Sequence, residues 1–250
     1  NLDGNFYIRD SSTMLMRLSN SDLHLLNSNW SINPRNSIVF GKDFIDVQDF
    51  VLQNGQRSIR LDRLGRKGIK LAMNNMDLGL LNGYLNFEPM EFGGRCNLEA
   101  RVEDVLSLKD LSLSLVSDTL SINQDDWGLM RLDVKMKDRQ HPLEAYFSLT
   151  KDTAQLLVEG YYNLSTFGES TEQQARYFDA NLNIHSYPLN IADYFVGDVF
   201  KNLYGYFDTD IHFSGDFSNP NISGNMYLMK GGLTVDYLKT NYTFERANVE

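Results

Sequence analysis

Apolar and polar residues alternate along most of this chain. A period of two is typical of β-strands that turn one face to an apolar environment and the other face to water. An Asn219-Pro220 turn separates two such strands near the C-terminus. The pattern is clearest before that turn, where the apolar positions are Phe207, Ile211, Phe213 and Phe217 and the polar positions are Asp208, Asp210, His212, Ser214 and Asp216.

Similar short runs follow one another from the N-terminus, at intervals of roughly 8 to 12 residues. This spacing is expected of an all-β sandwich, barrel or open sheet with short connections. The alternation changes phase at Phe50, which predicts a bulge or a turn there. Typical runs are Leu98, Ala100 and Val102, then Leu111, Leu113 and Leu115.

One segment departs from the period of two. Pro188 suits the first turn of a helix and Gly205 its end. We therefore predict a short amphipathic helix at about 188–203, directly before a repeat-like element at 204–250. No low-complexity linker divides the chain, so residues 1–250 are predicted to form one continuous body. The apolar residues with helical spacing are Leu189, Ile191, Tyr194, Phe195, Val199 and Leu203.

Composition narrows the classes of partner. The net charge is −10, from 23 basic and 33 acidic residues, which argues against nucleic acid, because phosphates require clustered Lys and Arg. Cys96 is the one cysteine, so no intrachain disulfide forms. No run of about 18 apolar residues indicates a membrane span, and no signal peptide is evident. The chain starts at Asn1 and stops in an alternating stretch, so we interpret it as a segment of a longer protein.

Motifs for catalysis and for metal binding are weak. The four histidines are widely separated, and Cys96 has no second cysteine, so the spacing for a zinc site is missing. The pair Asp125-Asp126 has the chemistry for acid–base work, but before Trp127-Gly128 we interpret it as a turn. The glycine pairs lack the lysine and the helix of a phosphate-binding loop. We therefore expect no enzyme activity, no metal and no cofactor.

The apolar stripe itself allows two interpretations. It forms either the closed core of an ordinary β-sandwich or the wall of an extended groove that shields acyl chains from water. Each buried methylene contributes about 0.8 kcal/mol, so a groove for one lipid chain needs no specific polar contact. Such loose binding leaves no sharp sequence motif.

Two segments resemble the TamB family of translocation and assembly module proteins, within the AsmA-like superfamily. The first is NLYGYFDTDIHFSGDFSNPNISGNMYL, with a step formed by Gly215, Phe217, Asn219, Pro220, Ile222 and Gly224. In that family a helix like the one predicted at 188–203 precedes the strand. The second segment is WSINPRNSIVFGKDFIDVQDFVLQNGQRSIRLDR. The tyrosine and asparagine content is similar to that of the Bacteroidetes branch.

The resemblance implies a fold and a function. It implies an elongated, strongly curved, mainly antiparallel sheet that forms a U-shaped apolar groove, called a β-taco, here with roughly 15 to 20 strands. Proteins of the family are anchored in the inner membrane, cross the periplasm, and are thought to carry phospholipid toward the outer membrane. They support outer-membrane protein assembly with a TamA-like outer-membrane protein of the Omp85 family. The expected partners are thus phospholipid acyl chains, this outer-membrane protein, and the inner membrane through an N-terminal anchor outside the chain.

We expect one parity of the strands to line the groove, while Asp133, Asp210, His212 and Asp216 face solvent. Two other classes stay open: a closed-core structural or adhesive β-protein that acts as an interaction module, and a carbohydrate-acting enzyme on a β-sheet platform. The residues expected to line a lipid-binding groove are Leu132, Val134, Met136, Phe147, Leu149, Val158, Leu182, Ile184, Ile211, Phe213, Phe217, Met226 and Leu228.

Overall fold

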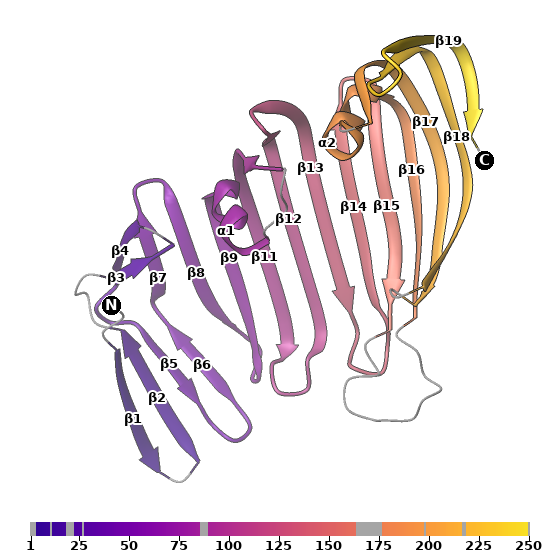
Figure 1. Cartoon of the computed structure of the whole chain (residues 1–250). Helices are drawn as coiled ribbons and strands as arrows, with labels where there is room; N and C mark the ends of the chain where they lie inside the picture. The colour runs from indigo at the N-terminus through magenta and orange to yellow at the C-terminus, as the bar shows by residue number, and fades with distance from the viewer. Residues whose placement is uncertain are drawn as a thin grey trace.

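The described part of the chain forms two antiparallel sheets and two short helical segments. A computed structural model describes residues 4–10, 12–18, 23–26, 28–85, 90–163, 177–197, 199–216 and 219–249. The larger sheet has 15 strands, and its order runs from β19 at one edge to β3 at the other, so the sheet does not close on itself (Figure 1). With strands about 4.8 Å apart, such a sheet is roughly 65 Å long. The prediction of an all-β protein with a long, curved, antiparallel sheet is confirmed.

The large sheet is mostly a meander, because each strand from β11 to β19 pairs with the next one along the chain. Short hairpins make this possible, and Asn123 and Gln124 adopt the positive φ angles that tight hairpin turns require. The strands are β3 (Leu23–Leu25), β4 (Ser28–Ile32), β7 (Phe50–Asn54), β8 (Arg57–Leu64), β9 (Gly68–Asp77), β10 (Phe92–Gly93), β11 (Arg95–Asp104), β12 (Lys109–Ile122), β13 (Asp125–Met136), β14 (Leu143–Lys151), β15 (Ala154–Tyr162), β16 (Phe178–Pro188), β17 (Phe200–Asp216), β18 (Asn219–Val235) and β19 (Thr240–Val249).

The remaining four strands form a separate sheet, where the sequence predicted a single one. They are β1 (Gly4–Asp10), β2 (Thr13–Leu18), β5 (Ser37–Phe40) and β6 (Ile45–Gln48). The change of phase at Phe50 marks the passage between the sheets, because β6 pairs with β5 whereas β7 pairs with β8. Asp49 lies between them with φ of 47°, a left-handed conformation that Asp tolerates.

The helical segments are shorter than the sequence predicted. The predicted helix at 188–203 is a 3₁₀ turn, η2 (Leu189–Ala192), followed by one α-helical turn, α2 (Asp193–Val196). Gly197 caps its end, not Gly205, and β17 begins at Phe200 because its backbone pairs with Val235 of β18. Strand pairing overrides the helical spacing of Val199 and Leu203, since spacing alone is a weak preference.

A second helical segment was not predicted. It consists of η1 (Leu78–Leu81) and α1 (Asn82–Leu85), between β9 and β10. The Asp77 side chain accepts a hydrogen bond from the Gly79 backbone N–H and caps its start. An Asp before an apolar run is the signal that could have revealed it.

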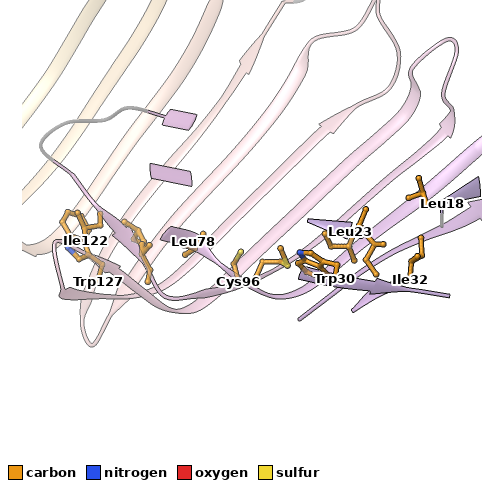
Figure 2. Packing of buried hydrophobic residues seen from close by; sticks show 13 residues of the cluster. Leu18, Leu23, Trp30, Ile32, Leu78, Cys96, Ile122 and Trp127 are labelled. Carbon is orange, nitrogen blue, oxygen red and sulfur yellow. The ribbon is translucent and has the colours of Figure 1, made fainter. Parts of the chain in front are cut away.

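Most buried apolar side chains of the described residues belong to two clusters. The first includes Trp30, Leu78 and Trp127, and Figure 2 shows its labelled residues in a row that follows the sheet from Leu18 to Trp127. The second lies around Tyr187 and Phe207. Figure 1 shows both helical segments at the same end of the strands, and Leu78 and Leu189 from these segments are buried in the clusters. The core is therefore closed mainly at this end of the sheet.

Candidate functional site

The apolar residues of the large sheet lie on one continuous face. Residues that pair directly across antiparallel strands point to the same side of the sheet, and the registers link one apolar residue after another. We define the apolar face by these rows and by the same-parity residues beside them. The first row is Leu98, Leu115, Leu132, Phe147, Val158, Leu182 and Ile211. The second row is Ala100, Leu113, Val134, Ala145, Gly160, Ala180, Phe213 and Ile222.

The structure brings together all the residues expected to line a groove, except that Phe217 lies outside the described residues. Leu149 pairs with Leu156, which pairs with Ile184, and Met226 and Leu228 pair with Thr209 and Phe207. Met136 pairs with Leu111 at the other end of the rows. Sequence reasoning left Leu111, Leu113, Leu115, Ala180 and Ile222 out of the groove set, although their alternation was the available signal.

Most of the apolar face is only half-buried. Leu149 and Met136 are buried, at 4% and 5% exposure, but Leu132, Phe147 and Phe213 remain partly exposed. Ile222 is 62% exposed. In a closed sandwich the central residues of the sheet would be the most buried ones. Here most buried residues cluster at one end of the strands, Met136 is buried near the other end, and the middle of the face stays open to solvent.

The opposite face of the sheet is polar. Its central row is Asp133, Tyr146, Glu159, Asn181 and His212, linked by the same registers. Asp210 pairs with Asn183 and belongs to this side as well. The Arg131 guanidinium forms an ion pair with Asp133 and holds the pKa of that carboxyl below its usual value. A hollow of about 790 Å³ on this face is lined by these charged groups together with Tyr146 and Tyr161.

A second cavity, of about 550 Å³, lies where the helical turn α2 meets the ends of β13 to β16. We call it the aromatic cavity. The ring of Trp127 lies 6.3 Å from that of Tyr187 and 6.0 Å from that of Tyr194, with the planes tilted by 47° and 38°. The residues that line the aromatic cavity are Asp125, Asp126, Trp127, Lys151, Asp152, Thr153, Ala154, Ser186, Tyr187, Pro188, Asn190, Ile191, Asp193, Tyr194 and Tyr206.

The acidic groups of the aromatic cavity differ in their partners. Tyr194 donates a hydrogen bond of 2.6 Å from its hydroxyl to Asp125 Oδ2. Lys151 Nζ lies 3.3 Å from Asp126 Oδ2, and the hydrogen bond from the Gly128 backbone, together with this lysine, lowers the pKa of Asp126. Partial burial raises the pKa of Asp193. Asp125 and Asp126 are not the turn that the sequence predicted, because they begin β13 and pair with Ile122 and Ser121.

The Tyr194–Asp125 bond predicts a dependence of stability on pH. Its hydrogen bond, with a smaller effect of burial, raises the pKa of Tyr194 from 10 to about 12. A folded-state pKa above the unfolded value means that the stabilisation is complete below pH 10 and is lost as the pH rises toward 12. Tyr194→Phe should lower the free energy of unfolding by about 1 kcal/mol below pH 10.

Urea unfolding of the wild-type and Tyr194→Phe proteins across this pH range tests the prediction. The difference between the two proteins should shrink as the pH rises from 10 to 12. Tyr237→Phe is the matched control, because that side chain is 93% exposed. A difference in the free energy of unfolding that stayed constant up to pH 12 would show that the hydrogen bond does not raise the pKa of Tyr194.

In the part of the chain that the structure describes, no three His, Cys, Asp or Glu side chains are grouped so that they could hold a metal ion. None of the helices in that same part has the length and apolar character needed to cross a membrane.

Comparison of the chain with models of known protein families, with curated proteins and with solved structures finds no match.

Proposed function

We propose that this chain is a segment of a TamB-like, periplasm-spanning bridge whose apolar face shields phospholipid acyl chains between the inner and the outer membrane. In this role it supports outer-membrane biogenesis and outer-membrane protein assembly. The resemblance of residues 202–228 and 30–63 to the TamB family supports this assignment. The chain itself performs no catalysis and carries no cofactor.

The observation that carries the proposal is the unbroken, half-exposed apolar face. A row of apolar residues runs from Leu98 on β11 to Ile211 on β17 without a polar interruption. Large exposed apolar surfaces on proteins mark sites of contact with another apolar partner. An acyl chain laid across these strands would lose water along its whole length, and each methylene would contribute about 0.8 kcal/mol.

The shape of the second row suits an extended chain. Ala145, Gly160 and Ala180 pair with one another on three adjacent strands, so the middle of this row carries small side chains. A Cβ atom added to Gly160 would lie 2.6 Å from the Asp179 carbonyl oxygen, so a larger side chain is not accommodated there. Larger residues flank the small ones, Val134 on one side and Phe213 on the other. This arrangement leaves a shallow depression over three strands in the middle of the row.

The partners follow from the same proposal. Phospholipid acyl chains are the ligand, and the polar opposite face keeps the sheet in contact with water. The bridge is placed in the periplasm, attached to the inner membrane through parts of the protein outside this chain. A TamA-like outer-membrane protein of the Omp85 family is the expected protein partner. The net charge of −10 gives no attraction to nucleic acid.

Native mass spectrometry of the purified chain tests the proposal. We expect phospholipid to co-purify and to leave as intact lipid when the collision energy is raised. Extraction followed by lipid analysis identifies the class. Protein that carries no lipid, and that takes up none from vesicles labelled with a fluorescent acyl chain, would contradict the proposal.

A closed-core interaction module is the second candidate, and the two buried clusters favour it. They show that part of the apolar surface is already covered by η1 and η2. In that function another protein surface covers the remaining face. A chain that binds no lipid, but whose Phe147 and Phe213 become protected from solvent in a complex, would favour this candidate.

A further inference from the structure

We propose that the aromatic cavity binds an organic ammonium ion, either the head group of an amphiphile or a free amine. Four aromatic rings and four carboxylates line the cavity, three of these rings lie close together around Trp127, and the cavity is large enough for a small organic molecule. This site is separate from the acyl-chain contacts and does not depend on them.

The first observation is that the aromatic rings of the cavity suit a cationic ligand. Trp127 lies between Tyr187 and Tyr194, and the tilted planes form an aromatic corner. The face of an aromatic ring carries negative charge density and attracts cations, and Trp is the strongest such partner. Aromatic corners of this kind suit ammonium groups that carry methyl or methylene substituents, because these groups have a diffuse charge and little hydration.

The second observation is the net negative charge of the side chains that line the aromatic cavity. Asp125, Asp126, Asp152 and Asp193 face one basic group, Lys151. Among the described residues, Asp126 is the only one of these carboxylates joined by an ion pair to a basic side chain. The surplus of negative charge favours a cationic ligand. The described carboxylates are not grouped to hold a metal ion, whereas an ammonium ion does not require a fixed ligand geometry.

Tyr187 is the independent observation that indicates a ligand. Its side chain is 5% exposed, and its hydroxyl has no hydrogen-bond partner among the described residues. A buried hydroxyl without a hydrogen-bond partner is destabilising, so its presence calls for an explanation. Tyr187 lines the cavity. After burial, the second cause that raises its pKa is the Asp126 carboxylate, a group of the same lining.

The position of the cavity explains how an amphiphile could use it. Ala154 lines the cavity and is buried in the second cluster, and Ile191 lines it and packs against both clusters. The apolar wall of the cavity therefore continues into the apolar face. A volume of about 550 Å³ exceeds the size of a bare ammonium ion and lies within the usual range of small-molecule pockets.

Isothermal titration of the whole chain provides the test. The probes are choline chloride, a short-chain phosphatidylcholine below its micelle concentration, and the acyl-matched phosphatidylglycerol. We expect the ammonium-bearing probe to bind, with an affinity that falls as salt is added. The double variant Asp125→Asn/Asp152→Asn should weaken this binding about tenfold, whereas Asp118→Asn, on an exposed site outside the cavity, should leave it unchanged.

Tyr187→Phe separates a ligand contact from a structural role. Removal of an unpaired buried hydroxyl should leave the thermal stability of the free protein unchanged or raise it. Binding of choline should weaken nevertheless, because the hydroxyl group of choline loses a hydrogen-bond partner. Weaker binding without lower stability supports the site. Unchanged binding in both Tyr187→Phe and the double Asp variant overturns it.

The two lipid probes distinguish the ammonium site from the proposed binding of acyl chains. Binding of choline alone identifies a free amine as the ligand. Binding of phosphatidylcholine at least about tenfold tighter than phosphatidylglycerol identifies a lipid head group. Equal binding of both lipids without binding of choline overturns the ammonium site and leaves the acyl-chain proposal intact. Binding of choline without either lipid supports the ammonium site and contradicts the acyl-chain proposal.

Discussion

Phe213→Asp is expected to abolish lipid binding while the sheet stays folded. Phe213 lies on the apolar face, pairs with Ala180 and Ile222, and belongs to neither buried cluster. A carboxylate there can still reach water, because the face is open and Ile222 is 62% exposed, so the cost of burying a charge is avoided. An acyl chain could not cover the carboxylate without removing that water, which should reduce bound lipid at least about tenfold.

Native mass spectrometry for bound lipid and circular dichroism for the sheet measure the two effects. Ser223→Asp is the matched control, since Ser223 pairs with His212 on the polar face of the same strand pair. In cells that carry the full-length protein, we expect Phe213→Asp to weaken the outer-membrane barrier to hydrophobic dyes. Ile184→Asp changes the same face, but it can also destabilise the fold, because Ile184 packs against the second buried cluster.

The competing functions give different results for Phe213→Asp. A closed core would bury the new carboxylate, so the variant would lose its circular dichroism signal. A variant that folds, binds lipid and supports the outer membrane like the wild-type protein would remove the lipid proposal. The control variant keeps these outcomes apart from a general effect of added negative charge.

Trp30→Ala should cause the largest loss of stability, about 3–5 kcal/mol. Trp30 is 5% exposed in the first cluster, and its Nε1–H donates a hydrogen bond of 2.9 Å to the Leu25 carbonyl oxygen. The Arg57 guanidinium lies 5.6 Å from the ring centre. Trp30→Phe is the matched control, because it keeps much of the ring packing and should lose only about 1 kcal/mol with the hydrogen bond.

We expect Trp30→Ala to destabilise only the strands near Trp30. Each strand of a long meander contacts mainly its neighbours, so stability is a sum of local terms. Hydrogen exchange should show lost protection in β3, β4, β7 and β8 and unchanged protection in β17 to β19. The chain has two tryptophans, so in the Trp30→Ala variant the fluorescence of Trp127 reports on the middle of the sheet. Loss of protection in every strand at the same urea concentration would contradict this local unfolding.

The limits of sequence reasoning are clear at three places. Val199 and Leu203 have helical spacing, but they lie in or beside β17, because pairing with β18 satisfies backbone groups that one helical turn cannot. Four of the N-terminal strands form their own sheet, which depends on the pairing of β2 with β5 although β3 and β4 lie between them in the chain. The aromatic cavity joins Asp125 to Tyr194 across 69 positions of sequence, and no local pattern predicts such a contact.

The sequence by itself determined the strands and the side of each strand that is apolar, because side chains alternate between the faces of an extended chain whatever lies beside it. Short connections between β13, β14 and β15 then fixed neighbouring registers, so Leu132, Phe147 and Val158 could be assigned to one face in advance. Only the tertiary structure decided which parts of that face are covered. Burial depends on where η1 and η2 pack against the sheet, and that packing is set by contacts between residues far apart in the chain.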